Sequence, residues 1–237
     1  MRKEPFTVGN YVHVYNRGNR KQPIVYDAAD KWRFLQMLYY FNNETAIVNP
    51  FKDLKNKLAW QFDNKLIWPK QWPKRKPLVK IIVFTLMKNH FHFLLKEIKK
   101  GGITSFMRKI GTGMTSYFNL KYQEVGRLFQ SAYKAKVISD DTYLGYLSVY
   151  IQVKNPFEFY SGGFEKAVVH FDKAFNWAIN YPYSSLGDYA GKRNYPIICK
   201  DVLGEMFKTS EEYKNFAEDC ILSMDLEESL EDLVIED

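Results

Sequence analysis

Several short stretches of the chain are rich in apolar, β-branched and aromatic residues and are bounded by turn residues, a pattern that predicts β-strands. Four such stretches occur, at residues 10–17, 78–87, 90–98 and 129–138. The first is rich in β-branched and aromatic side chains and ends at Gly18. The second and third are strongly apolar, and only Lys88-Asn89 separates them. We therefore expect four strands, the middle two joined by a tight connection.

Other segments carry apolar residues at the three- and four-residue spacing of amphipathic helices. These segments are residues 27 to about 42, 103 to about 122, and 140 to about 155. Asp27 or Asp30 can cap the first helix, and Asp140-Asp141-Thr142 can cap the third. Pro156 is expected to help end the third helix, because proline cannot donate a backbone hydrogen bond.

The elements follow the order strand, helix, strand, strand, helix, strand, helix. This order predicts an α+β fold, a ferredoxin-like antiparallel sheet with helices on one face. We expect one domain over residues 1–160, with an insertion at about 44–76. Residues 161–210 are expected to form an irregular C-terminal extension that packs on this domain. The acidic tail, residues 211–237, is either an amphipathic helix or mostly disordered.

The insertion mixes lysines with Trp60, Trp68 and Trp72. Exposed tryptophans beside cations suit single-stranded nucleic acid, because bases stack on the rings while phosphates meet the lysines. The alternative is that these tryptophans pack the insertion onto the core. The sequence favours neither interpretation.

The net charge of +7 is unevenly distributed. Residues 211–237 hold eleven acidic residues and one lysine, a net of −10, so the remaining 210 residues carry +17. A body this basic indicates a polyanionic partner, and nucleic acid is the commonest one. The alternative is an ordinary basic protein with solvated lysines.

Several classes of protein do not fit the sequence. No apolar run is long enough to span a membrane, and no apolar stretch follows the first five residues as in a signal peptide, so we expect no membrane partner. Cys199 and Cys220 form neither a metal pattern nor a disulfide framework, which favours a reducing cytoplasm. There is also no P-loop and no glycine-rich dinucleotide motif.

Two of the four histidines, His90 and His92, lie two residues apart on a predicted strand. Alternate side chains of a strand project from the same face, so both imidazoles can bind one divalent cation. A His-X-His pair is a weak signal alone. The alternative is two polar residues at a strand edge.

Tyrosine is abundant, so its number selects no nucleophile. Tyr143, Tyr146 and Tyr150 are spaced by three and four residues and share one face of the third predicted helix. The alternative is a core stripe with tyrosine hydroxyls at the surface.

Five segments in order resemble one family, the HUH single-strand transposases, and within it the REP-associated tyrosine transposase branch. The segments are Tyr11-Val-His-Val-Tyr-Asn-Arg-Gly-Asn-Arg20, Phe84-Thr-Leu-Met-Lys-Asn-His-Phe-His-Phe-Leu-Leu95, Gly126-Arg-Leu-Phe-Gln-Ser-Ala-Tyr-Lys134, Tyr150-Ile-Gln-Val-Lys-Asn-Pro156 and Tyr181-Pro-Tyr-Ser-Ser185. The resemblance covers residues 9 to about 190. It implies a ferredoxin-like fold and makes residues 1–160 the catalytic domain.

The resemblance also implies roles for individual residues. His90 and His92 correspond to the paired metal ligands, and Tyr150 corresponds to the nucleophile. A polar residue about one helical turn after the tyrosine usually completes the metal site. Here the stretch before Asn-Pro is one residue longer than usual, and Lys154, at that position, cannot act as a ligand. Asn155 or Gln152 is then the third ligand.

The implied reaction is DNA nicking and rejoining during transposition or recombination. Tyr150 attacks the scissile phosphate and leaves a 5′-phosphotyrosine with a free 3′-hydroxyl. Mg²⁺ or Mn²⁺ is the expected cofactor, because phosphate and water oxygens complete its shell. The expected partner is single-stranded or hairpin DNA with palindromic sequence, bound by a monomer or a homodimer.

Basic and polar residues after the first strand and near the fourth are candidates for gripping phosphates. They are Arg17, Asn19, Arg20, Lys21, Arg127 and Lys134, with Arg108, Lys109 and Lys136 as further candidates. For about half of them, ordinary surface charge is the better interpretation.

Three other functions are alternatives to this interpretation. A domesticated protein that binds hairpins without cutting them is favoured by the unusual spacing after Tyr150. A zinc-dependent or histidine-triad phosphohydrolase would need a third alternating histidine, but position 94 is leucine. A purely structural basic protein does not account for the ordered motifs.

Overall fold

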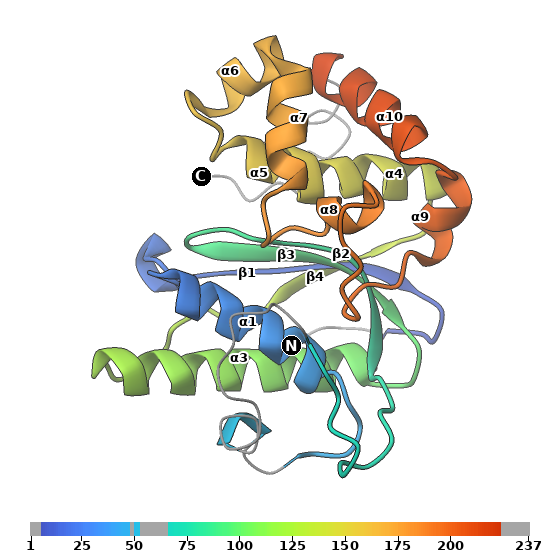
Figure 1. The fold of residues 1–237 in the computed structure, drawn as a ribbon. Helices are drawn as coiled ribbons and strands as arrows, with labels where there is room; N and C mark the ends of the chain where they lie inside the picture. Colours follow the sequence, from blue (N-terminus) through green and yellow to red (C-terminus); the bar gives the residue numbers. More distant parts are fainter. Residues whose placement is uncertain (1–5, 48–49, 53–65, 224–237) are drawn as a thin grey trace.

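A four-stranded antiparallel sheet forms the centre of the protein (Figure 1). The computed structural model describes residues 6–47, 50–52 and 66–223. The strands are β1 (Tyr11–Arg17), β2 (Val79–Leu86), β3 (His90–Glu97) and β4 (Lys134–Ile138), in the order β2-β3-β1-β4. Together with α1 (Ala28–Tyr40) after β1 and α3 (Gly102–Tyr122) after β3, this is the ferredoxin-like topology. The predicted fold class is confirmed.

The register of the two central strands decides which residues share a face. In the β1–β3 ladder, Tyr15 lies opposite His92 and Arg17 lies opposite His90. The same face of β2 presents Thr85, which lies opposite His92 on the other side of β3. Because side chains alternate, Phe91 and Phe93 point to the opposite face.

Helices α1 and α3 cover the face that receives the phenylalanines. Phe34 and Phe106 are fully buried there, and the ring of Phe34 lies 5.9 Å from that of Phe93. Asp27 caps α1 as predicted, and Asp30 completes a capping box by accepting from the Asp27 backbone. This layer is an ordinary apolar core, apart from the cap.

The second face of the sheet is covered as well, by helices from the C-terminal half of the chain (Figure 1). They are α4 (Asp141–Val149), a π-helical turn η2 (Tyr150–Lys154), α5 (Asn155–Phe157), α6 (Gly163–Val169), α7 (Phe171–Ile179), α8 (Leu186–Tyr189), α9 (Asp201–Met206) and α10 (Ser210–Leu222). The prediction placed helices on one face of the sheet, whereas in the structure α1 and α3 cover one face and α4 and the helices after it cover the other. The additional layer buries the side chains that alternate with the core phenylalanines.

Two predicted boundaries are wrong. The strand expected at 129–138 is shorter, because Phe129 makes only an isolated bridge to Gly18 and regular pairing begins at Lys134. Pro156 does not end the third helix, which continues to Phe157, because Pro156 occupies the first turn of α5, where a missing N–H is tolerated.

The extension at 161–210 was predicted to be irregular, and this is wrong. It contains α6, α7, α8 and α9. In α7 the buried residues Phe171, Ala174, Phe175 and Ala178 follow the spacing of an amphipathic helix, so the signal was present in the sequence.

Only the first part of the acidic tail lies within the described residues. Its first part is α10, which Thr209 and Glu212 begin with a capping box and which buries Tyr213 and Ala217 against the second layer. Of the two alternatives for the tail, the helix is therefore confirmed up to Leu222. Residues 224–237 lie outside the described part.

The described tryptophans of the insertion pack onto the protein. Trp68 and Trp72 lie 6.3 and 5.7 Å from the ring of Tyr40 and 5.1 Å from each other. For these two residues, packing rather than base stacking is the interpretation that holds. Trp60 lies outside the described residues.

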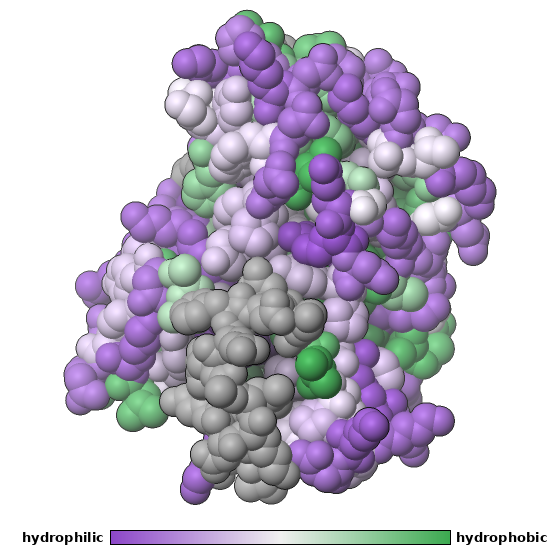
Figure 2. Space-filling view, in the orientation of Figure 1, coloured by the Kyte–Doolittle hydropathy of each residue, from purple (hydrophilic) through white to green (hydrophobic). Residues whose placement is uncertain are grey.

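The visible surface is mainly hydrophilic, and its hydrophobic residues are scattered (Figure 2). Among the described residues, no helix is long and apolar enough to cross a bilayer.

Candidate active site

Three histidines gather on the second face of the sheet, beneath the C-terminal layer. The ring of His92 lies 5.2 Å from that of His90 and 5.2 Å from that of His13 on the neighbouring strand. Tyr15 adds a fourth ring, 5.6 Å from His92. The sheet therefore places the predicted pair His90 and His92 side by side, as the alternation required.

His92 lies at the centre of this group and is fully buried. Its Nδ1 is 2.9 Å from Nε2 of His13, which is equally buried. Its Nε2 has no hydrogen-bond partner among the described residues. Burial lowers the pKa of His92 well below its usual value, and His13, His90 and Lys154 lower it further. Burial, helped by Lys136, lowers the pKa of His13 to about 3. Both rings are neutral at neutral pH.

His90 is oriented by the residue before it. The Asn89 Nδ2 donates to the backbone oxygen of Lys21 at 3.1 Å, so the other amide atom is the oxygen, and it lies 2.7 Å from Nδ1 of His90. An oxygen can only accept, so Nδ1 of His90 carries a proton and Nε2 of the neutral ring has the lone pair. Asn89 thereby links the His90 ring to the turn that holds Arg20 and Lys21.

Tyr150 reaches the histidines from the helical layer. Its ring meets that of His92 edge-on, with centroids 5.3 Å apart, and the residue is 3% exposed. Asp140 caps α4 as predicted, accepting from the Tyr143 backbone at 2.8 Å. The Thr85 hydroxyl donates to the backbone oxygen of Ile151, which ties the π-helical turn to the sheet. These contacts fix Tyr150 over the strand that holds His92.

Tyr146, a second candidate on this helix, has different surroundings. Tyr146 packs on Phe216 of α10, with ring centroids 5.7 Å apart. Of the two, only Tyr150 has a ring contact with a histidine among the described contacts. Helical spacing alone did not separate them, because residues at spacings of three and four share a face that is wide enough to meet two neighbours.

Three polar residues follow Tyr150, and each has different surroundings. Gln152 Oε1 accepts a hydrogen bond from the Ser185 hydroxyl at 2.5 Å, so this amide oxygen points to the residue that precedes α8. The ammonium of Lys154 lies 5.5 Å from the centroid of the Tyr150 ring and 3.2 Å from Glu158. Asn155 is 1% exposed, and its Nδ2 has no hydrogen-bond partner among the described residues.

A π-helical turn explains this arrangement. The backbone N–H of Asn155 donates to the oxygen of Tyr150, five residues earlier, instead of four. A π turn takes up one extra residue, so the residue five positions on lies about one turn above the first. The extra residue between Tyr150 and Asn-Pro is therefore absorbed within the helix.

The predicted phosphate-binding residues lie mainly at one end of the sheet. Arg17 lies opposite His90 in the β1–β3 ladder. Arg20 and Lys21 follow in a short 3₁₀ turn, η1 (Asn19–Lys21). The backbone N–H of Asn19 donates to the backbone oxygen of Leu128 at 2.8 Å. These contacts bring the Arg127 segment beside the turn. Arg20, Lys21 and Arg127 are exposed, whereas Arg17 is 6% exposed.

Lys134 lies on the edge strand β4, on the histidine side. Its ammonium is 5.9 Å from the centroid of the Tyr15 ring, and Tyr15 in turn contacts His92. Lys136, also exposed on β4, is opposite His13. A line of positive charge therefore runs from the open sheet edge toward the histidines.

The protein atoms alone do not make a complete metal site. Among the described residues, no group of three or more His, Cys, Asp or Glu residues could hold a metal ion. His90 and His92 offer two imidazole nitrogens, and the buried Nε2 of His92 is an atom that a cation would satisfy. The donor set thus fits a divalent ion that receives its remaining ligands from an amide, water or phosphate oxygens.

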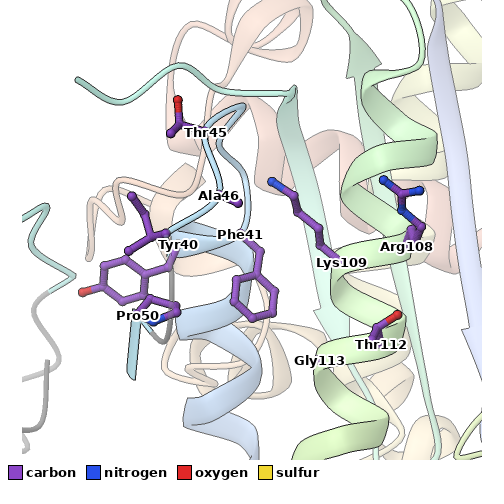
Figure 3. A pocket seen from close by; sticks show the side chains of 10 residues that line it. Tyr40, Phe41, Thr45, Ala46, Pro50, Arg108, Lys109, Thr112 and Gly113 are labelled. Atoms are coloured by element: carbon purple, nitrogen blue, oxygen red, sulfur yellow. The ribbon is translucent and has the colours of Figure 1, made fainter. Parts of the chain in front are cut away.

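A cavity among the described residues lies elsewhere, on the α1–α3 side of the sheet (Figure 3). It measures about 380 Å³ and is lined by Tyr40, Phe41, Thr45, Ala46, Ile47, Pro50, Arg108, Lys109, Thr112 and Gly113. Lys109 donates to the backbone oxygen of Asn43 at 2.5 Å, so its role is at least partly structural. The cavity is separated from Tyr150 by the sheet.

Sequence reasoning missed His13, Asn89 and Tyr15 as parts of this site. His13 and Tyr15 alternate with Arg17 on one strand, which places all three on the same face, and this signal was available. The contact of His13 with His92 was not, because it depends on the pairing of β1 with β3.

Residues 69–154 match the model of a protein family described as "Transposase IS200 like". The matched segment includes β2, β3, α3, β4 and α4, and with them His90, His92 and Tyr150. No curated protein matches the chain at a significant level. The solved structure of a REP-associated tyrosine transposase bound to a REP hairpin is similar with a TM-score of 0.44 and 13% identity, covering 84% of this chain and 89% of that one. Over residues 69–154, the chain is therefore similar to the IS200-like transposases.

Proposed function

We propose that this protein is a transposase that cuts and rejoins single-stranded or hairpin DNA through a covalent bond to Tyr150. The observation that carries the proposal is the contact of the Tyr150 ring with His92, beside His90, on a face that basic residues approach. A buried phenol, two neighbouring imidazoles and nearby cations suit attack on a phosphodiester.

The reaction balances without a nucleotide cofactor. The Tyr150 oxygen attacks phosphorus, its proton leaves to a base or water, and the bond from phosphorus to the 3′-oxygen breaks. The products are a 5′-phosphotyrosine and a free 3′-hydroxyl, which takes up a proton. The reverse attack by a 3′-hydroxyl releases Tyr150 and restores a phosphodiester, because the covalent intermediate conserves the bond.

The cofactor of this proposal is Mg²⁺ or Mn²⁺, held by His90 and His92. When bound, the ion would polarise the scissile phosphate and offset its developing charge. The residues of the chain prepare this site: Asn89 holds the His90 ring, and burial keeps His92 neutral and therefore able to ligate.

Asn155 is the better of the two candidates for a third ligand. Gln152 already accepts a hydrogen bond from Ser185, whereas the π-helical turn brings Asn155 about one turn above Tyr150. Both residues are buried, and each has an amide nitrogen without a hydrogen-bond partner among the described residues, so the position of the amide oxygen is what separates them.

The DNA strand would lie across the basic end of the sheet. Arg20, Lys21 and Arg127 are exposed beside the His90 end, and Lys134 lies on the open edge strand. Such contacts position the backbone without reading its sequence. Arg17 and Asn19 would act at the base of the same turn. The oligomeric state is proposed as monomer or homodimer.

A second candidate is a protein that binds hairpin DNA without cutting it. Lys154 favours it, since its ammonium lies beside Tyr150 at the position where a ligand is expected and repels a cation. The two candidates differ in a single property, the formation of a covalent adduct.

The test uses an end-labelled library of DNA hairpins with randomised single-stranded flanks, incubated with Mn²⁺ and analysed on denaturing gels. We expect an adduct that Tyr150→Phe and His90→Ala abolish. Tyr146→Phe is the matched control, because it removes a hydroxyl from the same helix but away from the histidines, and its adduct should match wild type. Salt-sensitive binding without any adduct would establish the second candidate instead.

A further inference from the structure

His13 is a buried histidine that the proposed reaction does not use. It is 0% exposed, and a hydrogen bond joins its Nε2 to Nδ1 of His92 at 2.9 Å. Its own Nδ1 has no hydrogen-bond partner among the described residues. Burying a polar ring whose second nitrogen has no such partner costs free energy, so the His13–His92 hydrogen bond calls for an explanation.

The bond has the geometry of a strong in-plane interaction. The two ring planes are inclined by 15°, and the centroids are 5.2 Å apart. With the nitrogens 2.9 Å apart, the N···N distance and the two ring radii account for the whole centroid separation. The rings therefore lie edge to edge in nearly one plane, where the lone pair of one nitrogen meets the N–H of the other.

Two proton arrangements satisfy this bond when both rings are neutral. In the first, Nδ1–H of His92 donates to His13, which leaves a lone pair on Nε2 of His92. In the second, Nε2–H of His13 donates to His92, which puts a proton on Nε2 of His92. Each arrangement leaves one N–H and one lone pair without a partner, so the number of hydrogen bonds does not distinguish the two arrangements.

A cation bound to His92 requires the first arrangement. Nδ1 of His92 is occupied by the hydrogen bond with His13, so Nε2 is the ring nitrogen left to bind a metal ion. It can do so only with a lone pair, which the first arrangement provides.

We propose that His13 is a positioning residue that accepts the Nδ1 proton of His92 and thereby presents the Nε2 lone pair of His92 to a divalent cation. Asn89 does the same for His90 through an amide oxygen. Both ring nitrogens facing the ion are then Nε2, each backed by its own acceptor. The inference rests on the proposed metal site, but its claim about the His92 proton concerns the protein alone.

The experiment has two readouts on the full-length protein. Two-bond ¹H–¹⁵N spectra of protein labelled at histidine nitrogens identify the tautomer of His92 without and with Mg²⁺, and calorimetry measures Mn²⁺ affinity. His13→Phe removes the acceptor, His13→Gln replaces it with an amide oxygen, and His170→Phe is the control, because His170 is an exposed histidine at the α6–α7 junction.

We expect wild-type His92 to carry its proton on Nδ1, in the absence and presence of Mg²⁺. In His13→Phe, Mn²⁺ affinity should fall by about tenfold to a hundredfold, the usual loss when a partner of a ligand is removed. His13→Gln should recover most of it, and His170→Phe should bind as wild type does. A folded His13→Phe protein with unchanged Mn²⁺ affinity overturns the inference.

Failure of the metal site itself is distinguishable. If wild type binds no Mn²⁺, the metal part of the proposed function fails, and the tautomer alone decides the role of His13. A proton on Nε2 of His92 in the wild-type protein overturns the role. A shift from Nδ1–H to Nε2–H on replacing His13 by Phe supports it. Circular dichroism and thermal unfolding show whether each variant is folded.

Discussion

The two faces of the sheet are built from the same strands but serve different purposes. On β3, Phe91 and Phe93 point to the α1–α3 layer and are packed among aromatic and aliphatic side chains. His90 and His92, the alternating residues, point to the C-terminal layer. The first face buries apolar surface, and the second buries polar groups at a cost in solvation. The alternation of side chains along β3 therefore places the residues that stabilise the core on one face and the residues of the proposed site on the other.

The largest expected effect comes from the apolar face. Phe93→Ala removes a fully buried ring and leaves a cavity, which should lower the free energy of unfolding by about 3–5 kcal/mol. Urea unfolding followed by tryptophan fluorescence measures this loss. Unchanged stability would mean that the face is not the main core.

The next effect comes from the neighbouring residue on the other face. His92→Leu should reduce adduct formation by about 100- to 1,000-fold, the loss expected when one charge-stabilising group is removed. Its unfolding free energy should change far less than that of Phe93→Ala, because Leu94 already occupies this face. Rates of adduct formation and urea curves, measured on both variants, make the comparison. A collapse of stability in His92→Leu would contradict the separation of the two faces.

A smaller effect concerns the ion pair that joins α1 to α3. Burial alone would raise the pKa of Asp30, but hydrogen bonds from Lys121, Tyr122, the Tyr26 backbone and Tyr117 lower it to about 2. A folded pKa below the ordinary value of 3.8 gives stability that is present above about pH 4 and lost as the pH falls toward 2. The loss should be about 2 kcal/mol.

Asp30→Asn isolates that contribution. The variant starts from a lower stability, but it should lack the part of the decline between pH 4 and 2 that Asp30 causes. Urea unfolding of both proteins at several pH values in this range gives the difference in slope. Parallel curves for the two proteins would show that Asp30 is not the group responsible.

The smallest expected effect tests the charge beside the proposed metal site. Lys154→Gln replaces the ammonium near Tyr150 by a neutral amide, so Mn²⁺ affinity should rise by less than about tenfold, on the order of 1 kcal/mol for a partly solvated charge. Calorimetry measures the change, with Lys100→Gln as the control, because Lys100 is an exposed lysine just before α3, on the other side of the sheet. A fall in affinity would show that Lys154 supports the site rather than opposing it.

Much of this architecture could be predicted from local pattern. The strand and helix order, the caps at Asp27 and Asp140, and the shared face of His90 and His92 all follow from spacing within one segment. The helices of the extension could have been found as well, because α7 carries a regular apolar spacing. The shortened β4 could not, because pairing with β1 decides where it begins.

The sequence by itself determined which residues face each way along each strand, because side chains alternate with a fixed period. It also determined the candidate chemistry, two histidines and a tyrosine with an odd spacing before Asn-Pro. Only the tertiary structure decided which tyrosine meets the histidines, that a π-helical turn absorbs the extra residue, and that His13 backs His92. The physical reason is that these contacts join strands and helices far apart in the chain, and their distances depend on pairing and packing that no local pattern encodes.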